Sequence, residues 1–293
     1  MKIGILVDSS ATADPTIFTK TLVECLPLHL TYGAEVDILD TPENMEKHQV
    51  YESIKQGAVW KTSQASPGEV AQRYEKMLKK YDHVIHIPIT DNLSSMLGTA
   101  LIVSRENRFV DKVTVIKNNT LAAQAISLMA LHLSTLIKEG VLETPEMVVD
   151  EFYKMATVFY IGIIPGDLKR LASGGRATKI ASSILNVFKT KVLIRWQEKP
   201  EKEGMGRTVG SLTDKAVRGM KELFPNQKFH VILTTVPIYN EKNRKAAAAV
   251  LKEEKIKYSK EPIPHLYPVH AGLETVGFIA YPLNFKIHPE MEK

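Results

Sequence analysis

The chain has 293 residues, of which 44% are hydrophobic and 24% are charged, and its formal net charge is +5. This length is sufficient for two domains with separate cores, and the composition is that of an ordinary globular protein. Because the positive charge is mild and spread along the chain, we expect no nucleic-acid partner, whereas an anionic ligand stays open. The single cysteine, Cys25, excludes an intramolecular disulfide framework.

The sequence carries no signal for a membrane span or for export. It has no uncharged apolar run of about eighteen residues, and its most apolar segment, 121–137, is interrupted by Gln124 and His132. The apolar run at the N-terminus is too short for the core of a signal peptide. We therefore expect a cytoplasmic protein, for which transient contact with a membrane surface stays open.

Strand-like and helix-like segments alternate through the first half of the chain. Short apolar runs predict strands at 2–8, 83–90 and 112–118. Capping residues and apolar periodicity predict helices between them, at 16–25, from Thr41-Pro42, at 71–81, at 91–107, and from Asn119-Thr120 to about Gly140. A strand followed by a helix, repeated, predicts a parallel sheet in a layered α/β domain.

The pattern changes after a further helix, which Thr144-Pro145 opens and which ends near Thr157. We place a domain boundary there, so that residues 1–157 form an N-terminal α/β domain and residues 158–293 form a C-terminal α/β domain with a mixed sheet. The C-terminal part contains strand-like runs at 157–165, 191–197, 228–237, 255–263 and 275–283. The charged, glycine-containing stretch 198–207 is predicted to be a solvated loop.

The stretch KTSQASPGEV, residues 61–70, offers more hydrogen-bonding groups than the following helix needs. One Ser or Thr is enough to accept from the N–H groups of a first helical turn. Four polar side chains precede this helix, namely Thr62, Ser63, Gln64 and Ser66. At the carboxyl end of a parallel strand, beside a helix N-terminus, the surplus would form an anion site. Capping alone is the competing interpretation.

A second polar cluster, ITDNLSSMLGT at residues 89–99, follows the next predicted strand. Neighbouring parallel strands would bring Ser94 or Ser95 to the same edge of the sheet as Thr62. Alternatively, Asp91 or Asn92 caps the helix and the two serines have no further role.

Two later segments also carry candidate residues. His270 precedes Ala271-Gly272 in a predicted loop before the last strand, and Arg176 follows Gly174-Gly175 and offers a fork that pairs with a carboxylate or phosphate. A structural histidine and a solvated arginine are the competing interpretations. The sequence has no Walker A motif, no G-x-G-x-x-G, no G-x-S-x-G and no cysteine pair, which disfavours a nucleotide-binding enzyme or a metalloenzyme.

These clusters, in this order, resemble the DegV family of fatty-acid-binding proteins. That family shows D-S-S/A after its first strand, then T-S-Q-P-S-P-G-E, I-S-S-x-L-S-G-T, L-x-x-L-x-x-G-G-R and H-x-G-P-G. The chain has the corresponding segments VDSSA at 7–11, TSQASPGE at 62–69, ITDNLSSM at 89–96, LKRLASGGR at 168–176 and HAGLE at 270–274. The second segment is the most specific, with Ala65 in place of proline as its one change.

The resemblance implies an N-terminal three-layer α/β/α domain with a parallel sheet, a C-terminal domain with a mixed sheet, and a long-chain fatty acid held between them. It implies that Thr62, Ser94 and the network of His270 bind the carboxylate. Supporting roles would fall to Ser63, Gln64, Ser95 and Arg176. No catalytic residue, metal or cofactor is implied. The chain would be a carrier that presents the fatty acid to a separate kinase, which uses ATP to form an acyl phosphate.

One departure from the family pattern bears on the site. Asp91 stands where the family has the second serine of I-S-S, and its charge would repel a carboxylate unless the side chain points away as a helix cap.

The physical chemistry of such a ligand agrees with the polar surplus before the helix. A buried chain of about fifteen methylenes contributes about 12 kcal/mol of gross transfer free energy before the costs of association. The carboxylate loses its hydration on entry, so it needs charge-assisted hydrogen bonds. Sequence does not identify the tunnel itself, because core and tunnel residues have the same composition. Examples that would fit are Ile126, Met129, Ile163, Ile164 and Phe278.

Two other functions stay open on the sequence. A serine esterase or acyltransferase would use Ser94 or Ser95 with His270 as the base, and Asp8 or Asp91 as the acid. A small-polyol carrier of the dihydroxyacetone kinase type would need a small polar pocket instead of an elongated apolar one.

Overall fold

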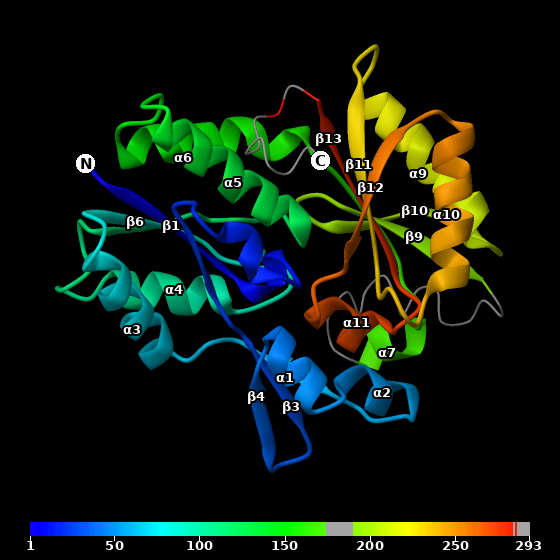
Figure 1. Ribbon diagram of the computed structural model, residues 1–293, viewed down its shortest axis with the longest axis horizontal. Coiled ribbons are helices and arrows are strands. Elements are labelled where there is room, and N and C mark those ends of the chain that lie inside the picture. Colours follow the sequence, from blue (N-terminus) through cyan, green and yellow to red (C-terminus); the bar gives the residue numbers. More distant parts are fainter. Residues whose placement is uncertain (174–189, 284, 286–293) are drawn as a thin grey trace.

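The computed structural model describes residues 1–173, 190–283 and 285. These residues form a parallel sheet, a mixed sheet and a small antiparallel sheet, with helices that cover them (Figure 1). We call residues 1–157 the N-terminal region and residues 158–293 the C-terminal region. The boundary between them falls within a 3-10 turn, η3 (Ala156–Val158), and its status as a domain boundary stays a prediction.

The parallel sheet has four strands in the order β2-β1-β6-β7. Their bounds are Ile3–Asp8 for β1, Val23–Leu26 for β2, His83–Ile87 for β6 and Val113–Val115 for β7. Every residue of β1 and β6 is buried, as expected for strands that are covered on both faces. The chain runs from β1 to β2 on one side and later returns to the other side as β6. Ligand sites of open α/β sheets lie beyond the carboxyl ends of the strands at such a reversal.

Helices cover both faces of this sheet, which confirms the three-layer prediction (Figure 1). On one face lie α5 (Gln124–Lys138) and α6 (Pro145–Met155), and on the other lie α3 (Pro67–Leu78) and α4 (Met96–Ser104). Successive side chains of a strand point to opposite faces, so Ile5 packs in the core with α5, and Leu6 packs in the core with α3.

A small antiparallel sheet lies beside the parallel one and was not predicted. Its strands follow the order β4-β3-β5. Their bounds are His29–Tyr32 for β3, Val36–Leu39 for β4 and Lys61–Ser63 for β5. Two short helices, α1 (Pro42–Lys47) and α2 (Val50–Lys55), connect β4 to β5. Thr41 caps α1 as the sequence predicts, because its side chain accepts from the backbone N–H of Asn44.

Within the described ranges the mixed sheet has six strands in the order β10-β9-β8-β13-β11-β12, and of their pairs only β11–β12 is parallel. The bounds are Tyr160–Ile164 for β8, Lys191–Trp196 for β9, Pro200–Gly206 for β10, Phe229–Thr235 for β11, Lys257–Pro262 for β12 and Val276–Pro282 for β13. Two helices, α9 (Val209–Leu223) and α10 (Glu241–Glu253), cover its outer face (Figure 1). The inner face shares a core with α5 of the N-terminal region.

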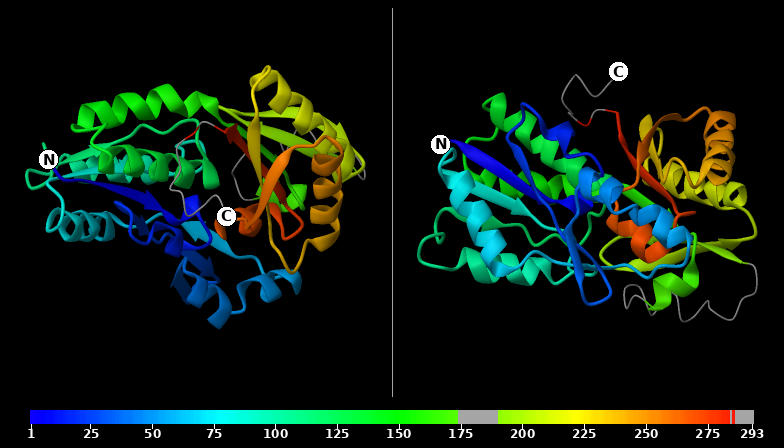
Figure 2. Two further views of the ribbon diagram at one scale, coloured as in Figure 1. Left: turned by 45° about the horizontal axis from the view of Figure 1, so that its top comes forward. Right: turned by 60° about the horizontal axis from the view of Figure 1, so that its bottom comes forward.

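Two short helices, α7 (Leu168–Ser173) and α11 (Leu266–Ala271), lie at one end of the mixed sheet. Helix α11 lies close to α2 (Figures 1 and 2). The rings of Tyr51 in α2 and His265, which precedes α11, lie 6.1 Å apart.

Several predicted elements were wrong. Residues 16–25 form a 3-10 turn, η2 (Pro15–Phe18), followed by β2. The hydroxyl of Thr21 donates to the carbonyl of Phe18 and accepts from the N–H of Val23, and these local bonds replace helical ones. The predicted loop 198–207 contains β10, which pairs with β9. Asn119-Thr120 does not cap α5, because the neighbouring side chain of Asn118 holds a turn there and the helix begins later.

Candidate functional site

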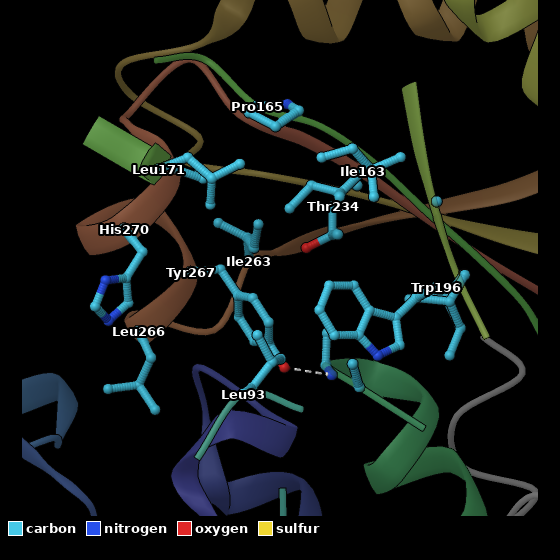
Figure 3. A pocket seen from close by; sticks show the side chains of 18 of the residues that line it. Leu93, Ile163, Pro165, Leu171, Trp196, Thr234, Ile263, Leu266, Tyr267 and His270 are labelled. Carbon is cyan, nitrogen blue, oxygen red and sulfur yellow. Dashed lines mark hydrogen bonds between the residues drawn. The ribbon is translucent and has the colours of Figure 1, made fainter. Parts of the chain in front are cut away.

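An apolar cavity lies between the carboxyl end of the parallel sheet and the inner face of the mixed sheet (Figure 3). It contains about 830 Å³ of space, which includes the part that opens to solvent. The mixed sheet contributes one wall, consisting of Ile161, Ile163, Ile194, Trp196, Thr234 and Ile279. The N-terminal region contributes Ile89, Leu93, Ala122 and Ala123, and α11 contributes Leu266, Tyr267 and His270.

Strand register explains why these side chains form one wall. Ile161 is paired with Ile279 and with Trp196, and Ile163 is paired with Gly277. Paired residues of neighbouring strands share a face of the sheet. At Gly277 an added Cβ atom would lie 2.6 Å from Cγ2 of Thr234, so this glycine keeps the wall free of a clash and leaves room in the cavity.

Of the five example tunnel residues, only Ile163 lines the cavity. Ile164 and Phe278 belong to the core under α9 and α10, because side chains alternate between the faces of a strand. Ile126 and Met129 lie in the core between α5 and the parallel sheet.

The structure brings Thr62 and His270 together. Oγ1 of Thr62 and Nε2 of His270 are hydrogen-bonded at 2.7 Å. His270 lines the cavity, so this bond marks one end of it. The local settings differ from those expected: Thr62 lies on β5 of the antiparallel sheet, not at the end of a parallel strand. His270 lies in α11, not in a loop, because the helix continues to Ala271 and ends at Gly272 with φ +88°.

The neighbouring polar residues contact the N-terminal end of α4. Nε2 of Gln64 donates to Oγ1 of Thr99, a buried residue of α4, at 2.5 Å. Ser94 directly follows the cavity residue Leu93, and its Oγ accepts from the N–H of Met96 at 3.2 Å. The hydroxyl hydrogen of Ser94 takes no part in that bond, and Ser94 is not among the described residues that line the cavity.

The remaining candidates are less closely tied to the cavity. Ser63 and Ser95 are exposed, and Ser95 is the N-cap residue of α4 without a side-chain cap bond. Asp91 is also exposed, and its backbone N–H donates to the carbonyl of Asn118. Arg176 lies outside the described residues.

Asp8 positions a residue of the cavity. The sequence analysis named it only as a possible acid of a serine esterase. At the end of β1, its Oδ2 accepts from the N–H of Ile89 at 2.7 Å, and its Oδ1 accepts from the N–H of Ser10 at 3.1 Å. It therefore ties the cavity residue Ile89 to the end of the neighbouring strand. Complete burial raises the pKa of Asp8 to about 6. The signal for it was a lone acid directly after a buried strand.

Tyr267 was missed altogether. Its hydroxyl accepts from the backbone N–H of Ala123 at 2.7 Å, a bond that joins α11 to the N-terminal region at the wall of the cavity (Figure 3). Ala123 has φ 51° and ψ −140°, a conformation that is rare for residues other than glycine and that clusters at functional sites. No local pattern indicates this pair, because its members lie 144 positions apart.

Contacts from two directions fix α11, which carries His270. Arg170 of α7 donates through Nη1 to the carbonyl of Val269 at 3.3 Å and through Nη2 to the carbonyl of Ala58 at 3.1 Å. At the start of the helix, Nδ1 of His265 and Oδ1 of the buried Asp40 lie 2.8 Å apart. The position of His270 thus depends on contacts between the two regions.

Within the described ranges, no three His, Cys, Asp or Glu side chains are grouped so that they would hold a metal ion. Among the helices of those same ranges, none has both the length and the apolar character needed to cross a membrane.

Comparison with known proteins identifies the family. Residues 2–283 match the family model described as "Uncharacterised protein, DegV family". A curated relative from Thermotoga maritima named fatty acid-binding protein is 28% identical over 200 residues, which cover 66% of this chain and 67% of the relative.

Solved structures agree with this match. A structure described as a DegV lipid binding protein from Thermotoga maritima is 25% identical, with a TM-score of 0.82 over 98% of this chain and 100% of that one. A stearic acid-binding protein from Eubacterium ventriosum shares the fold at 18% identity, with a TM-score of 0.80 over 96% of this chain and 98% of that one. Since the family model covers nearly the whole sequence, this chain belongs to the DegV family.

Proposed function

We propose that the chain binds one long-chain fatty acid, with the tail in the apolar cavity and the carboxylate at the end where Thr62 and His270 meet. The observation that carries the proposal is the cavity itself, whose wall is almost entirely hydrocarbon and which reaches a hydroxyl–imidazole pair at 2.7 Å. Membership of the DegV family and the fatty-acid-binding relatives support it.

In this proposal the tail supplies affinity and the head group sets orientation. About fifteen buried methylenes contribute about 12 kcal/mol of gross transfer free energy, most of which association and ordering offset. The carboxylate exchanges water for charge-assisted hydrogen bonds. We assign these bonds to Thr62 and Ser94, with His270 orienting the hydroxyl of Thr62. Supporting positions are Ser63, Gln64, Ser95 and Arg176.

Gln64 illustrates what a supporting position does. Its bond to Thr99 fixes the stretch after β5 against α4, and the proposal places the carboxylate between this stretch and the N-terminal end of α4. The partial positive charge of a helix N-terminus favours an anion there, and this charge adds to the hydrogen bonds from the side chains.

We further propose that the chain is a cytoplasmic carrier and that a separate kinase performs the chemistry. A carboxylate oxygen of the bound acid would attack the γ-phosphorus of ATP on that kinase, with release of ADP and formation of an acyl phosphate. The family resemblance supports this step, and so does the proposed position of the carboxylate at one end of the cavity. The chain itself then needs no metal or cofactor.

The first test is chemical analysis of the purified protein. Organic extracts should contain a long-chain fatty acid, and isothermal titration calorimetry of the delipidated protein with palmitate should show one site. Absence of both would refute the binding proposal. Formation of a hydroxamate from palmitate, ATP, hydroxylamine and a co-purifying kinase, dependent on this chain, tests the carrier role separately.

The esterase and the polyol carrier each predict a result that the fatty-acid carrier does not. An esterase would be labelled by a fluorophosphonate at Ser94 or Ser95, and we expect no label because Nε2 of His270 is bonded to Thr62. A polyol carrier would bind dihydroxyacetone in calorimetry, and we expect no binding because the cavity wall is apolar.

A further inference from the structure

Two cavities of the molecule meet at Trp196. The apolar cavity has His270 at one end, and the close view places the indole of Trp196 at the opposite side (Figure 3). A second cavity, of about 1,030 Å³ including its open part, shares Ile161 and Trp196 with the first among the residues that the structure describes. Ile161 and Trp196 therefore lie where the two cavities adjoin.

We propose that the indole of Trp196 is the end wall of the acyl cavity and sets the longest fatty acid that the protein binds well. This inference rests on the proposed function, in which the carboxylate lies at the His270 end. The tail then runs toward Trp196, and its last carbon meets the indole. Beyond the indole, the second cavity offers space that a longer chain enters only when the indole is smaller or displaced.

Packing against neighbouring side chains holds the indole in place. Trp196 is 8% exposed, and its buried Nε1 has no hydrogen-bond partner among the residues that the structure describes. A buried indole N–H usually has such a partner. A smaller apolar side chain at this position therefore breaks no hydrogen bond and leaves no polar group unpaired, so its effect on binding reports the shape of the cavity.

The second cavity suits only a few additional methylenes. Its inner part includes the buried side chains of Ala156 and Phe159, whereas Gln197, Glu198 and Lys199 are exposed at its rim. Nδ2 of Asn92 donates to the carbonyl of Glu198 at 2.7 Å and holds that rim to the N-terminal region. A chain end that passes the indole meets apolar surface first and charged, hydrated groups soon after.

The expected effect is a change in chain-length preference. Each methylene that finds an apolar place improves the dissociation constant about fourfold. In the wild type, affinity should rise with chain length and then level off or fall at the length that reaches the indole. We call the chain length at which affinity stops rising the break. In Trp196→Ala the break should lie at least two carbons further, because the space of the indole and the second cavity become accessible.

The test measures dissociation constants of saturated acids from twelve to twenty-two carbons for delipidated wild type, Trp196→Ala and Trp196→Phe. For each protein we compare the affinity for acids longer than the wild-type break with the affinity for shorter acids. This ratio should rise at least tenfold in Trp196→Ala, and less in Trp196→Phe. The control is Trp60→Phe, because Trp60 is also buried but lies outside the cavity, against Tyr32. It should keep the wild-type break.

A break that stays at the same length in both Trp196 variants, or an equal loss for every acid, overturns the assignment of Trp196 while the carrier function stands. Failure of the wild type to bind any acid contradicts the carrier function itself. If Trp196→Ala does not fold, the chain-length preference of Trp196→Phe and the fluorescence experiment below still test whether Trp196 ends the cavity.

Fluorescence locates the tail directly. The chain has two tryptophans, so in Trp60→Phe all indole emission comes from Trp196. Bromine quenches an indole that it touches, and 16-bromohexadecanoic acid should therefore quench this emission strongly, whereas 2-bromohexadecanoic acid should not. Equal quenching by both, or stronger quenching by the 2-bromo acid, overturns the proposed direction of the chain.

Discussion

Thr62 and Ser66 lie four residues apart, yet their hydroxyls have different partners. Ser66 forms a capping box with Glu69 at the start of α3, which is the structural role expected of one hydroxyl in this position. Thr62 bonds instead to His270, 208 positions away, at the end of the apolar cavity. The surplus of polar groups before the helix is thus divided between a cap and the candidate site.

Removal of the Thr62 hydroxyl should weaken fatty-acid binding. A hydrogen bond to a charged group contributes about 1.5–3 kcal/mol, so Thr62→Val should raise the dissociation constant of palmitate about tenfold to a hundredfold in calorimetry. Thr62→Ser keeps the hydroxyl and should stay within a few-fold of the wild type. Thr31→Val, on the neighbouring strand β3, is the matched control. Equal effects of Thr62→Val and Thr31→Val would show that the hydroxyl does not bind the head group.

Asp8 should make stability depend on pH. Its folded-state pKa of about 6 lies above the ordinary value of 3.8 because burial disfavours the charged form. Between these values the folded protein binds more protons than the unfolded chain, so the free energy of unfolding falls as pH rises from about 4 to about 6. The loss from this group is about 3 kcal/mol. Urea unfolding of wild type and Asp8→Asn across this range should show a steeper decline in the wild type, and parallel curves would contradict the assignment.

At the scale of elements, the sequence predicted correctly where a helix begins if a nearby side chain caps it. The Thr-Pro entries at Thr41 and Thr144 mark real N-caps, because each hydroxyl accepts from a backbone N–H three residues on. Strand β10 looked like a solvated loop because its sequence is charged and lacks the alternation of apolar and polar residues that predicts a strand. It lies at the edge of the sheet, and its pairing with β9 makes it a strand. The setting of β5 was missed for a related reason, since its partner β3 lies some thirty residues earlier.

Loss of the Ser66 cap should separate stability from binding. Ser66→Ala removes the acceptor for the N–H of Glu69 and should lower the free energy of unfolding by about 1 kcal/mol, measured by urea denaturation. Affinity for palmitate should stay unchanged, because Ser66 points to the helix and not to the cavity. A loss of affinity equal to that of Thr62→Val would mean that the whole stretch acts as one unit.

At the scale of the whole molecule, the candidate site exists only where the two regions meet. The motifs brought Thr62 and His270 into one hypothesis through a family resemblance, and the structure places them in contact. The cavity wall was beyond sequence reasoning, because Ile163 lines it while its neighbour Ile164 fills a separate core. That distinction depends on the register and orientation of the mixed sheet, which no local pattern encodes.

The contact between Asp40 and His265 should couple stability to binding. His265→Ala leaves the buried carboxylate of Asp40 without its partner, which should cost about 1–3 kcal/mol in urea unfolding. It also loosens the start of α11, so affinity for palmitate should fall although His265 does not line the cavity. The double variant Asp40→Ala, His265→Ala should recover part of the stability but not the affinity. Full affinity in His265→Ala would show that α11 is held sufficiently by Arg170 alone.

The most direct test of the central claim is native mass spectrometry of the protein as purified, beside Thr62→Val and Trp196→Ala. The account predicts a wild-type species that carries one long-chain fatty acid, a largely unoccupied Thr62→Val, and longer acids bound to Trp196→Ala. A wild-type protein that carries no acyl ligand and takes up none from added palmitate would contradict it.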